Sequence, residues 1–201
     1  MKSAGRKSRL SGLLEMSERE EFARLLLADL LRVVGSAGLL RSSYVVSPDA
    51  DMLALASRIG SQTVEEPRDM GVNAAVARGL GVVPGAGSVL VIPADLPLLK
   101  RSELLHLVGS AADGRGLTIA PSKAFDGTNA LMFPRSARLS LSYDRDSFWN
   151  HLSGAAREGL PVRVCTEPGL MFDVDAPGDF EELALSRSGR PSAEFARRAA
   201  R

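Results

Sequence analysis

Acidic side chains stand where two apolar runs of the sequence end. Asp95 follows the run SVLVIP at residues 88–93, and Asp173 and Asp175 lie in MFDVDAP at residues 171–177. We predict a strand buried on both faces at 88–93 and another strand at 171–174, which would place Asp173 and Asp175 on one side. Ligands of open α/β sheets bind beyond the carboxyl ends of strands, and carboxylates there suit Mg²⁺. A structural role is the alternative: Asp95 can cap a turn, and Asp175 can cap the helix that Pro177 opens.

A basic segment near the N-terminus offers groups that bind anions. In KSAGRKSRL, at residues 2–10, Lys7 and Arg9 flank Ser8, and Gly5 permits a tight backbone. Fixed cations and backbone donors before a helix suit a polyphosphate. The segment lacks the GxxxxGK[ST] pattern of a P-loop, and a solvated basic terminus is the alternative interpretation.

Two further segments carry hydroxyl groups in positions that favour oxyanions. Thr128 in GTNAL, at residues 127–131, can join backbone amides in an oxyanion cradle, with ordinary turn chemistry as the alternative. Ser147 in SFWNH, at residues 147–151, lies near the expected N-terminus of a helix. We expect Trp149 to pack in the core and His151 to be a packing or exposed histidine without a catalytic role.

Strand and helix patterns alternate along the chain, which predicts an α/β protein with a mostly parallel sheet. We expect a loop at residues 1–14, and then a helix that Ser17 caps with Glu20 in a capping box and that Gly35 and Gly38 end. Residues 188–201 are expected to form a frayed basic tail or a loosely docked helix. The other expected elements are helices at 50–59, 72–80, 102–108, 146–157 and 177–185, and strands at 43–46, 62–64, 117–120, 129–133 and 162–164.

Composition narrows the class of protein. The 201 residues are enough for one domain with its own core, and a net charge of +1 argues against a nucleic-acid binder or a polybasic membrane protein. Cys165 is the only cysteine, which excludes an intramolecular disulfide and favours an intracellular setting. The sequence contains no apolar run of 18 residues and no signal-peptide pattern. We therefore expect a cytoplasmic protein with small-molecule partners, no nucleic acid, no membrane, and a possible homodimeric state.

Six segments resemble, in order, sequence blocks of the CofC-type guanylyltransferases of coenzyme F-420 biosynthesis. PADLPLL alone is shared with many nucleotidyltransferases, whereas GTNAL followed by SF..H and DVD..D is much more specific. The resemblance runs from Ala4 to Leu183. The six segments are AGRKSRL, NAAV, PADLPLL, DGTNAL, DSFWNHL and FDVDAPGDF.

The resemblance implies a nucleotidyltransferase domain at residues 1–187, with the nucleotide-diphospho-sugar transferase fold: a Rossmann-like sheet with helices on both faces. It implies transfer of GMP from GTP to 2-phospho-L-lactate, or to phosphoenolpyruvate in some bacteria, with release of pyrophosphate. It also implies residue roles. Nucleotide contacts fall to Gly5, Lys7, Ser8, Arg9, Asn73 and Asp95; catalytic contacts to Asp95, Lys7 and Arg9; magnesium to Asp95, Asp173 and Asp175; and the phospho-acid to Thr128 and Ser147.

Two departures from the family pattern carry expectations of their own. Relatives have an apolar strand before the basic loop, and Met1 directly precedes the loop here, so either the start lies upstream or that strand is absent. Asp144 stands where relatives commonly have glycine, and its carboxylate would repel a phosphate unless Arg145 offsets it or the loop is arranged differently.

Three other functions compete with this interpretation. The first is a nucleotidyltransferase of the molybdopterin or sugar-phosphate type, and the second is an inactive nucleotide-binding homologue. The third is a glycosyltransferase that uses residues 173–175 as its metal motif.

Overall fold

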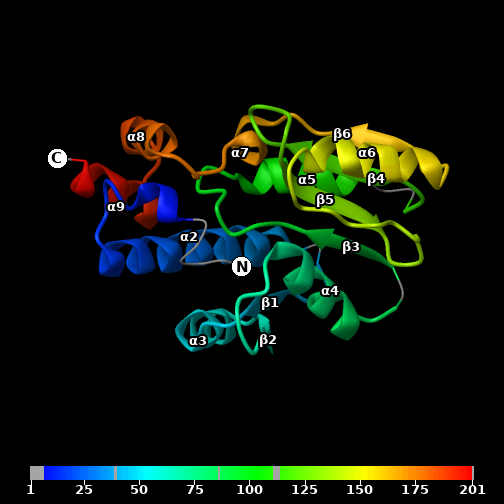
Figure 1. Cartoon of the computed structure of the whole chain (residues 1–201), viewed down its shortest axis with the longest axis horizontal. Helices are drawn as coiled ribbons and strands as arrows, with labels where there is room; N and C mark the ends of the chain where they lie inside the picture. Colours follow the sequence, from blue (N-terminus) through cyan, green and yellow to red (C-terminus); the bar gives the residue numbers. More distant parts are fainter. Residues whose placement is uncertain (1–6, 39, 86, 111–113, 201) are drawn as a thin grey trace.

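The computed structural model describes residues 7–38, 40–85, 87–110 and 114–200, with the side chains of Lys7 and Ser8 excepted. Helices and strands alternate along this part of the chain, as the sequence predicts (Figure 1). None of the described helices is long and apolar enough to cross a membrane. The elements are η1 (Lys7–Leu10), α2 (Met16–Ala37), β1 (Tyr44–Ser47), α3 (Ala50–Arg58), β2 (Gln62–Glu65), α4 (Val72–Val82), β3 (Ser88–Val91), α5 (Arg101–Ser110), β4 (Leu117–Pro121), β5 (Thr128–Pro134), α6 (Ser147–Arg157), β6 (Val162–Val164), α7 (Pro168–Met171), α8 (Pro177–Leu185) and α9 (Pro191–Ala199).

Within the described ranges the strands form two sheets. β1 and β2 pair in parallel, and the larger sheet has the order β3-β5-β4-β6. β6 runs parallel to β4, whereas β5 is antiparallel to both β3 and β4. The α/β class is confirmed, but among the described strands the larger sheet is mixed rather than mostly parallel. The reason lies in the short loop at residues 122–127, because a connection of that length joins only antiparallel strands.

Helices cover both faces of the larger sheet, as expected. On one face Leu117, Ile119 and Leu131 pack with Phe148 and Ala155 of α6. On the other face, alanines of β4 and β5 pack with leucines of α5 and aliphatic residues of α2. The alternation of side chains along each strand therefore builds two separate cores from one sheet.

Two expectations about strands are wrong. Val89, Leu90 and Val91 of β3 are only half-buried, because β3 lies at the edge of the larger sheet and pairs with β5 alone among the described strands. The strand buried on both faces is β4. Residues 171–174 form no strand. Met171 ends helix α7, and the residues that follow it pair with no strand of either sheet.

The N-terminal part folds more tightly than the expected loop. Residues 7–10 form a 3₁₀ turn, and Leu10 is completely buried in a cluster with Phe22 of α2 and Phe180 of α8. The expected cap of helix α2 is wrong: Glu15 rather than Ser17 is the N-cap residue, and Glu18 rather than Glu20 completes the capping box, since the Glu18 carboxylate accepts the Glu15 backbone N–H at 2.8 Å. The helix continues through Gly35 and ends at Gly38 in the left-handed conformation.

The C-terminal segment is a docked helix and not a frayed tail. Ala193, Phe195 and Ala196 of α9 are buried, and the Phe195 ring stacks on Phe22 with 5.5 Å between centroids. Figure 1 shows α9 beside one end of α2. Of the two expected alternatives, the docked helix is confirmed, and its packing is closer than the basic residues of the segment suggest. A stripe of small and aromatic residues on α9 packs against the cluster that contains Leu10, Phe22 and Phe180.

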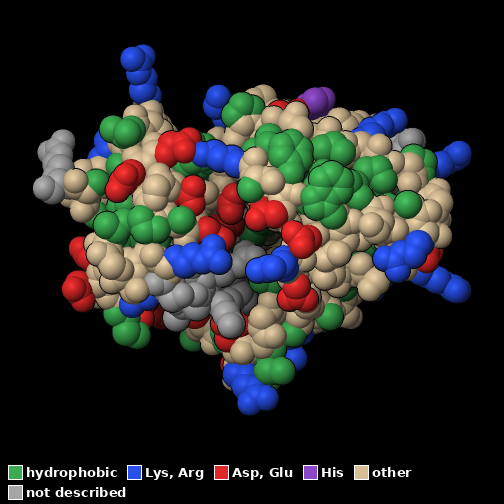
Figure 2. All heavy atoms as spheres, turned by 45° about the horizontal axis from the view of Figure 1, so that its top comes forward, with side chains coloured by type: hydrophobic (Ala, Val, Ile, Leu, Met, Phe, Trp, Pro, Cys, Tyr) green, Lys and Arg blue, Asp and Glu red, His purple; other side chains and the backbone are tan. Residues whose placement is uncertain are grey.

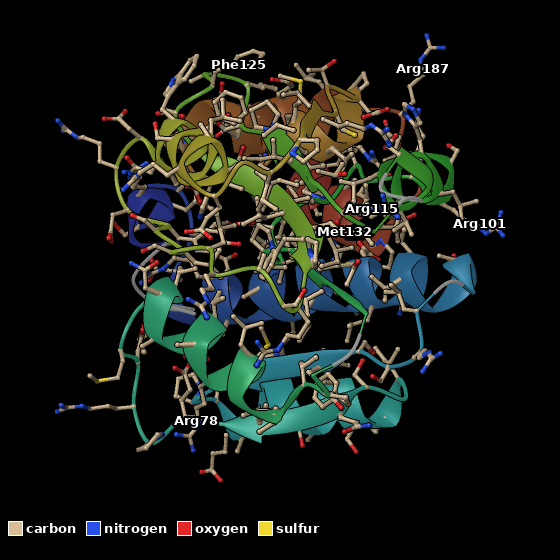
Figure 3. All side chains as sticks on the ribbon, turned by 90° about the vertical axis from the view of Figure 1, so that its right-hand side faces the viewer. Arg78, Arg101, Arg115, Phe125, Met132 and Arg187 are labelled. Atoms are coloured by element: carbon tan, nitrogen blue, oxygen red, sulfur yellow. The ribbon has the colours of Figure 1, made fainter. Side chains whose placement is uncertain are left out.

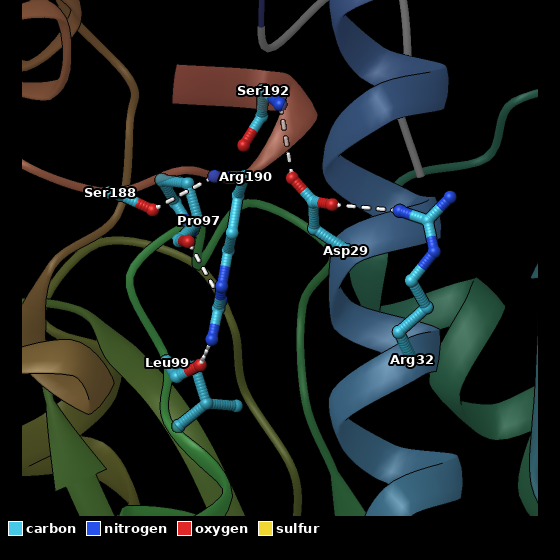
Figure 4. Close-up of polar contacts among 7 residues, drawn as sticks. All are labelled: Asp29, Arg32, Pro97, Leu99, Ser188, Arg190 and Ser192. Carbon is cyan, nitrogen blue, oxygen red and sulfur yellow. Dashed lines mark hydrogen bonds and ion pairs between the residues drawn. The ribbon is translucent and has the colours of Figure 1, made fainter. Parts of the chain in front are cut away.

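Arg190 connects α9 to the loop that follows Asp95 (Figure 4). Its guanidinium donates to the Pro97 carbonyl oxygen at 2.7 Å and to the Leu99 carbonyl oxygen. Nearby, the buried Asp29 carboxylate accepts the Ser192 backbone N–H at 3.0 Å and pairs with Arg32. Burial lowers the pKa of Arg190, and the charges of Asp29 and Glu103 oppose that shift. The loop at residues 97–99 is therefore held to α9, which is held to α2.

Replacing Arg190 by methionine tests this connection. The Arg190→Met variant leaves two carbonyl oxygens without their charged donor, so we expect the free energy of unfolding in urea to fall by about 1–3 kcal/mol. Arg187→Met is the control, because Arg187 is exposed and points into solvent (Figure 3). Its expected effect is within about 0.5 kcal/mol. Equal losses in the two variants would contradict the assigned role.

Candidate functional site

The strand register brings predicted site residues together at one end of the strands of the larger sheet, where β3 ends and β5 begins. Val91 of β3 pairs with Leu131 of β5 in antiparallel register, so the chain beyond Val91 runs alongside the start of β5. Asp95 follows the end of β3, and Thr128 opens β5. The N-terminus of α6 lies at the same end, since Phe148 N–H donates to the Asp126 carbonyl oxygen at 3.3 Å.

The three predicted metal ligands lie close enough to act on one another. The Val174 N–H donates to the Asp95 carbonyl oxygen at 3.1 Å, which joins the two acidic segments. The pKa of Asp173 is raised to about 6: burial is the largest cause, a hydrogen bond from Asn129 opposes it, and the charges of Asp95 and Asp175 add to the rise. Figure 2 shows acidic side chains around a hollow in the surface, with basic side chains at its rim.

The chemistry of these carboxylates fits magnesium, although their present arrangement is not a coordination shell. Among the described residues, no group of three or more His, Cys, Asp or Glu side chains is arranged to hold an ion. Carboxylate oxygens are the ligands that a hard cation prefers. A cation would also relieve the repulsion from Asp95 and Asp175 that, after burial, contributes to the raised pKa of Asp173. Magnesium binding by Asp95, Asp173 and Asp175 therefore stays a prediction.

The structural alternative for Asp175 is not observed. Ala176 is the N-cap residue of α8, and the Asp179 carboxylate accepts the backbone N–H groups of Asp175 at 3.1 Å and Ala176 at 2.8 Å. Asp179 therefore caps the helix that Pro177 opens.

A buried glutamate holds the Asp95 loop against the acidic segment. Glu103 of α5 accepts the Lys100 N–H at 2.7 Å and the Gly169 N–H of α7 at 3.0 Å. A side chain at position 169 would place its Cβ 2.6 Å from the Leu98 carbonyl oxygen, so this contact requires glycine. Helix α7 thereby has a fixed position, and Asp173 follows it directly.

An irregularity in β5 sends its first two side chains to different partners. Ala120 pairs with Ala130 and Pro121 pairs with Thr128, so one step on β4 spans two on β5 and Asn129 is the extra residue. The buried Asn129 amide donates to the Leu170 carbonyl oxygen at 3.0 Å and to Asp173 Oδ1 at 3.1 Å. Bulges re-aim side chains next to functional sites, and this one directs Asn129 to the acidic segment and Thr128 to α6.

Thr128 belongs to a buried chain of polar groups. Its hydroxyl lies 3.0 Å from His151 Nδ1 and 3.3 Å from the Ser147 hydroxyl, and all three residues are buried. The Ser142 backbone N–H donates to His151 Nε2 at 3.1 Å. Burial lowers the pKa of His151 to about 4, so its ring is neutral at pH 7.

The loop before β5 places Arg9 on the side of the site. The Ser122 hydroxyl donates to Asp126 at 2.7 Å and is the main reason that the pKa of Asp126 is lowered. The charge of Arg9 lowers this pKa as well. Lys7 and Ser8 belong to the same 3₁₀ turn as Arg9, although their side chains lie outside the description, and Gly5 lies outside the described residues.

Asn73 binds the loop before α6. Its side chain accepts the Tyr143 N–H at 2.7 Å and donates to the Asp144 carboxylate at 2.9 Å. Asp144 is thus turned towards α4, which is the different loop arrangement that the sequence left open. A direct contact of Asn73 with the nucleotide stays a prediction.

Comparison with known proteins identifies the family. The family model described as "Guanylyl transferase CofC like" matches residues 1–200. The chain belongs to the CofC-like guanylyltransferase family. It is 36% identical to a phosphoenolpyruvate guanylyltransferase from Rubrobacter xylanophilus, over 90% of this chain and 89% of that protein. It is 31% identical to a 2-phospho-L-lactate guanylyltransferase from Methanothermobacter thermautotrophicus, over 96% of this chain and 84% of that protein.

A solved structure supports the same fold at lower identity. A protein from Desulfovibrio desulfuricans, described as a nucleotide-diphospho-sugar transferase, superposes with a TM-score of 0.73 and 16% identity, covering 96% of this chain and 88% of that one. The fold expected from the CofC resemblance is therefore confirmed.

Two residues of this CofC family member have site contacts that the sequence prediction did not assign. From the sequence, Asn129 is only one residue of the GTNAL segment, and His151 is predicted to have no catalytic role. A signal existed in the spacing, because GTNAL and SF..H carry polar residues next to apolar ones that must be buried. Trp149 shows the converse error, since it is 56% exposed rather than in the core.

The buried His151 makes stability depend on pH. The pKa of His151 is about 4 in the folded chain, against an ordinary histidine value of 6.5 that applies to the unfolded chain. Between pH 4 and pH 6.5 the unfolded chain therefore binds a proton at His151 that the folded chain does not. Stability is complete above pH 6.5 and falls as the pH approaches 4, by roughly 3 kcal/mol for this group. Urea unfolding between pH 7.5 and 4.5 measures the effect. The His151→Leu variant should lack this component, and an unchanged pH dependence in that variant would refute the assignment.

Proposed function

We propose that the chain is a guanylyltransferase that joins GMP from GTP to a small phospho-acid and releases pyrophosphate. The observation that carries this proposal is the meeting of three carboxylates and a buried hydroxyl pair at one end of the strands of the larger sheet, in a CofC-like chain. The phospho-acid is phosphoenolpyruvate or 2-phospho-L-lactate, and the 36% identical relative favours phosphoenolpyruvate. The product is a precursor in coenzyme F-420 biosynthesis.

The reaction requires positioning of anions more than proton transfer. An oxygen of the substrate phosphate attacks the α-phosphorus of GTP, the new P–O bond forms, and the bond to the β-phosphate bridge breaks. A phosphate monoester has a second pKa of about 6, so the nucleophile is already ionised at neutral pH. His151 is consistent with this, because its Nε2 already accepts the Ser142 N–H and its ring serves no base function.

Each set of residues has a separate task in this proposal. Thr128 and Ser147 orient the phospho-acid, while Lys7 and Arg9 stabilise the charge that develops on pyrophosphate. Gly5, Ser8 and Asn73 belong to the nucleotide side of the site. Asp95, Asp173 and Asp175 would hold magnesium, which supplies charge neutralisation and alignment of the phosphates when bound.

Substitution of the acidic residues tests their role. We expect Asp95→Ala and Asp173→Ala to lower kcat by about 10³-fold, because such a clamp contributes several kcal/mol to transition-state stabilisation. Pyrophosphate release measures the effect, and circular dichroism checks the fold. Asp51→Ala is the control, since Asp51 is exposed on α3. Wild-type rates in both acidic variants would refute the assignment.

A substrate panel tests the proposed function itself. Pyrophosphate release is measured with GTP or CTP, each combined with phosphoenolpyruvate, 2-phospho-L-lactate or 3-phosphoglycerate. We expect turnover with GTP and one of the first two phospho-acids. A preference for CTP would indicate another nucleotidyltransferase. Calorimetric binding of GTP without pyrophosphate release would indicate an inactive homologue, and transfer in a separate assay with sugar nucleotides would indicate a glycosyltransferase.

A further inference from the structure

We infer that His151 is a positioning residue which, through Thr128 and Ser147, presents one hydroxyl proton to an anionic oxygen of the phospho-acid. The inference rests on the proposed function and adds to it a residue that does not touch the substrate. Its basis is the directed sequence of hydrogen bonds that joins Ser142, His151, Thr128 and Ser147.

The backbone fixes the position of the proton on the imidazole ring. The Ser142 N–H can only donate, so His151 Nε2, 3.1 Å away, accepts and carries no proton. A neutral ring then has its proton on Nδ1, which lies 3.0 Å from the Thr128 hydroxyl oxygen. Thr128 therefore accepts from His151. The complete burial of the ring and its edge contact with Tyr143, at 4.9 Å between centroids, hold this orientation.

The hydrogen-bonded series of His151, Thr128 and Ser147 has one more proton than it uses internally, so it ends in a donor. His151, Thr128 and Ser147 together have three polar protons: Nδ1–H and two hydroxyl protons. The first is donated to Thr128, and one hydroxyl proton occupies the 3.3 Å contact between Thr128 and Ser147. One hydroxyl proton is left for an acceptor outside these three groups. The opposite ring tautomer would turn Thr128 into a donor towards His151 and remove that proton.

The surroundings of this donor favour an anion. Ser147 opens α6, a helix of 11 residues whose first turn contains no acidic side chain; the N-cap residue Asp146 is exposed and makes no side-chain capping bond. The amide dipoles of the helix therefore add partial positive charge at Ser147. The carboxylate of Asp144 is held by Asn73 at 2.9 Å. A carboxylate or phosphate oxygen of the phospho-acid is the acceptor that matches a hydroxyl donor next to a helix N-terminus.

Two variants of the same shape test the inference. In His151→Asn, the side-chain amide can still donate to Thr128, whereas His151→Leu has no donor. Steady-state pyrophosphate release gives KM for the phospho-acid and for GTP. A hydrogen bond to a charged group corresponds to about a tenfold or greater change, so His151→Leu should raise KM for phosphoenolpyruvate at least about tenfold. KM for GTP should stay within about twofold, and His151→Asn should recover most of the loss.

Nitrogen-15 NMR of the wild-type protein provides a readout that does not depend on activity. The chain has only two histidines, and the exposed His106 serves as the internal reference. We expect the His151 signals of an Nδ1-protonated neutral ring throughout the range from pH 6 to 8. Signals of an Nε2-protonated or cationic ring would overturn the inference.

The kinetic outcomes separate this inference from the proposed function. Equal losses in His151→Leu and His151→Asn, or equal increases in both KM values, would indicate a merely structural histidine and overturn the inference alone. An unchanged KM in His151→Leu would do the same. A wild-type protein that releases no pyrophosphate from GTP with any phospho-acid would overturn the proposed function, and with it the ligand assigned to Thr128.

Discussion

The extra residue in β5 is the constraint on which the arrangement of the site depends. Without it, strict alternation would place Thr128 and Asn129 on the faces opposite to those that they occupy. The register shift beside Pro121 lets Asn129 reach Asp173 while Thr128 reaches His151. One irregular step thus supplies both halves of the site from two neighbouring residues. It connects the acidic segment after α7 to the buried polar groups under α6 through a single strand.

The two halves of the site solve different electrostatic problems. At the acidic segment, burial and the neighbouring charges of Asp95 and Asp175 both raise the pKa of Asp173, and a bound cation would offset these negative charges. Around His151, burial keeps the ring neutral, and hydrogen-bond direction takes the place of charge. A phospho-acid between them would meet a hydroxyl donor and a helix N-terminus. The proposed reaction between two anions would use both halves, because neither half alone would attract and align both substrates.

The scaffold fixes the site through contacts far from it in the sequence. Glu103 ties the start of α5 to α7, and Arg190 ties the loop after Asp95 to the C-terminal helix. Both side chains bind backbone groups, so they fix the path of the chain whatever side chains those loops carry. The C-terminal helix therefore supports the loop that carries Asp95, although no catalytic or binding residue is predicted in that helix from the sequence.

The sequence by itself determined the α/β class, most helix positions, the CofC family and the segments that carry Asp95, Thr128, Ser147 and Asp173. These follow from local patterns and motif order, which tertiary contacts rarely override. Only the tertiary structure decided that β3 is an edge strand, that residues 172–175 pair with no strand of either sheet, and that α9 is docked. It alone also decided that Asn129 contacts Asp173 and that His151 contacts Thr128. The physical reason is that strand neighbours, a one-residue register shift and the direction of a buried hydrogen bond depend on pairs of residues far apart in the chain. No local pattern of residue types records such pairs.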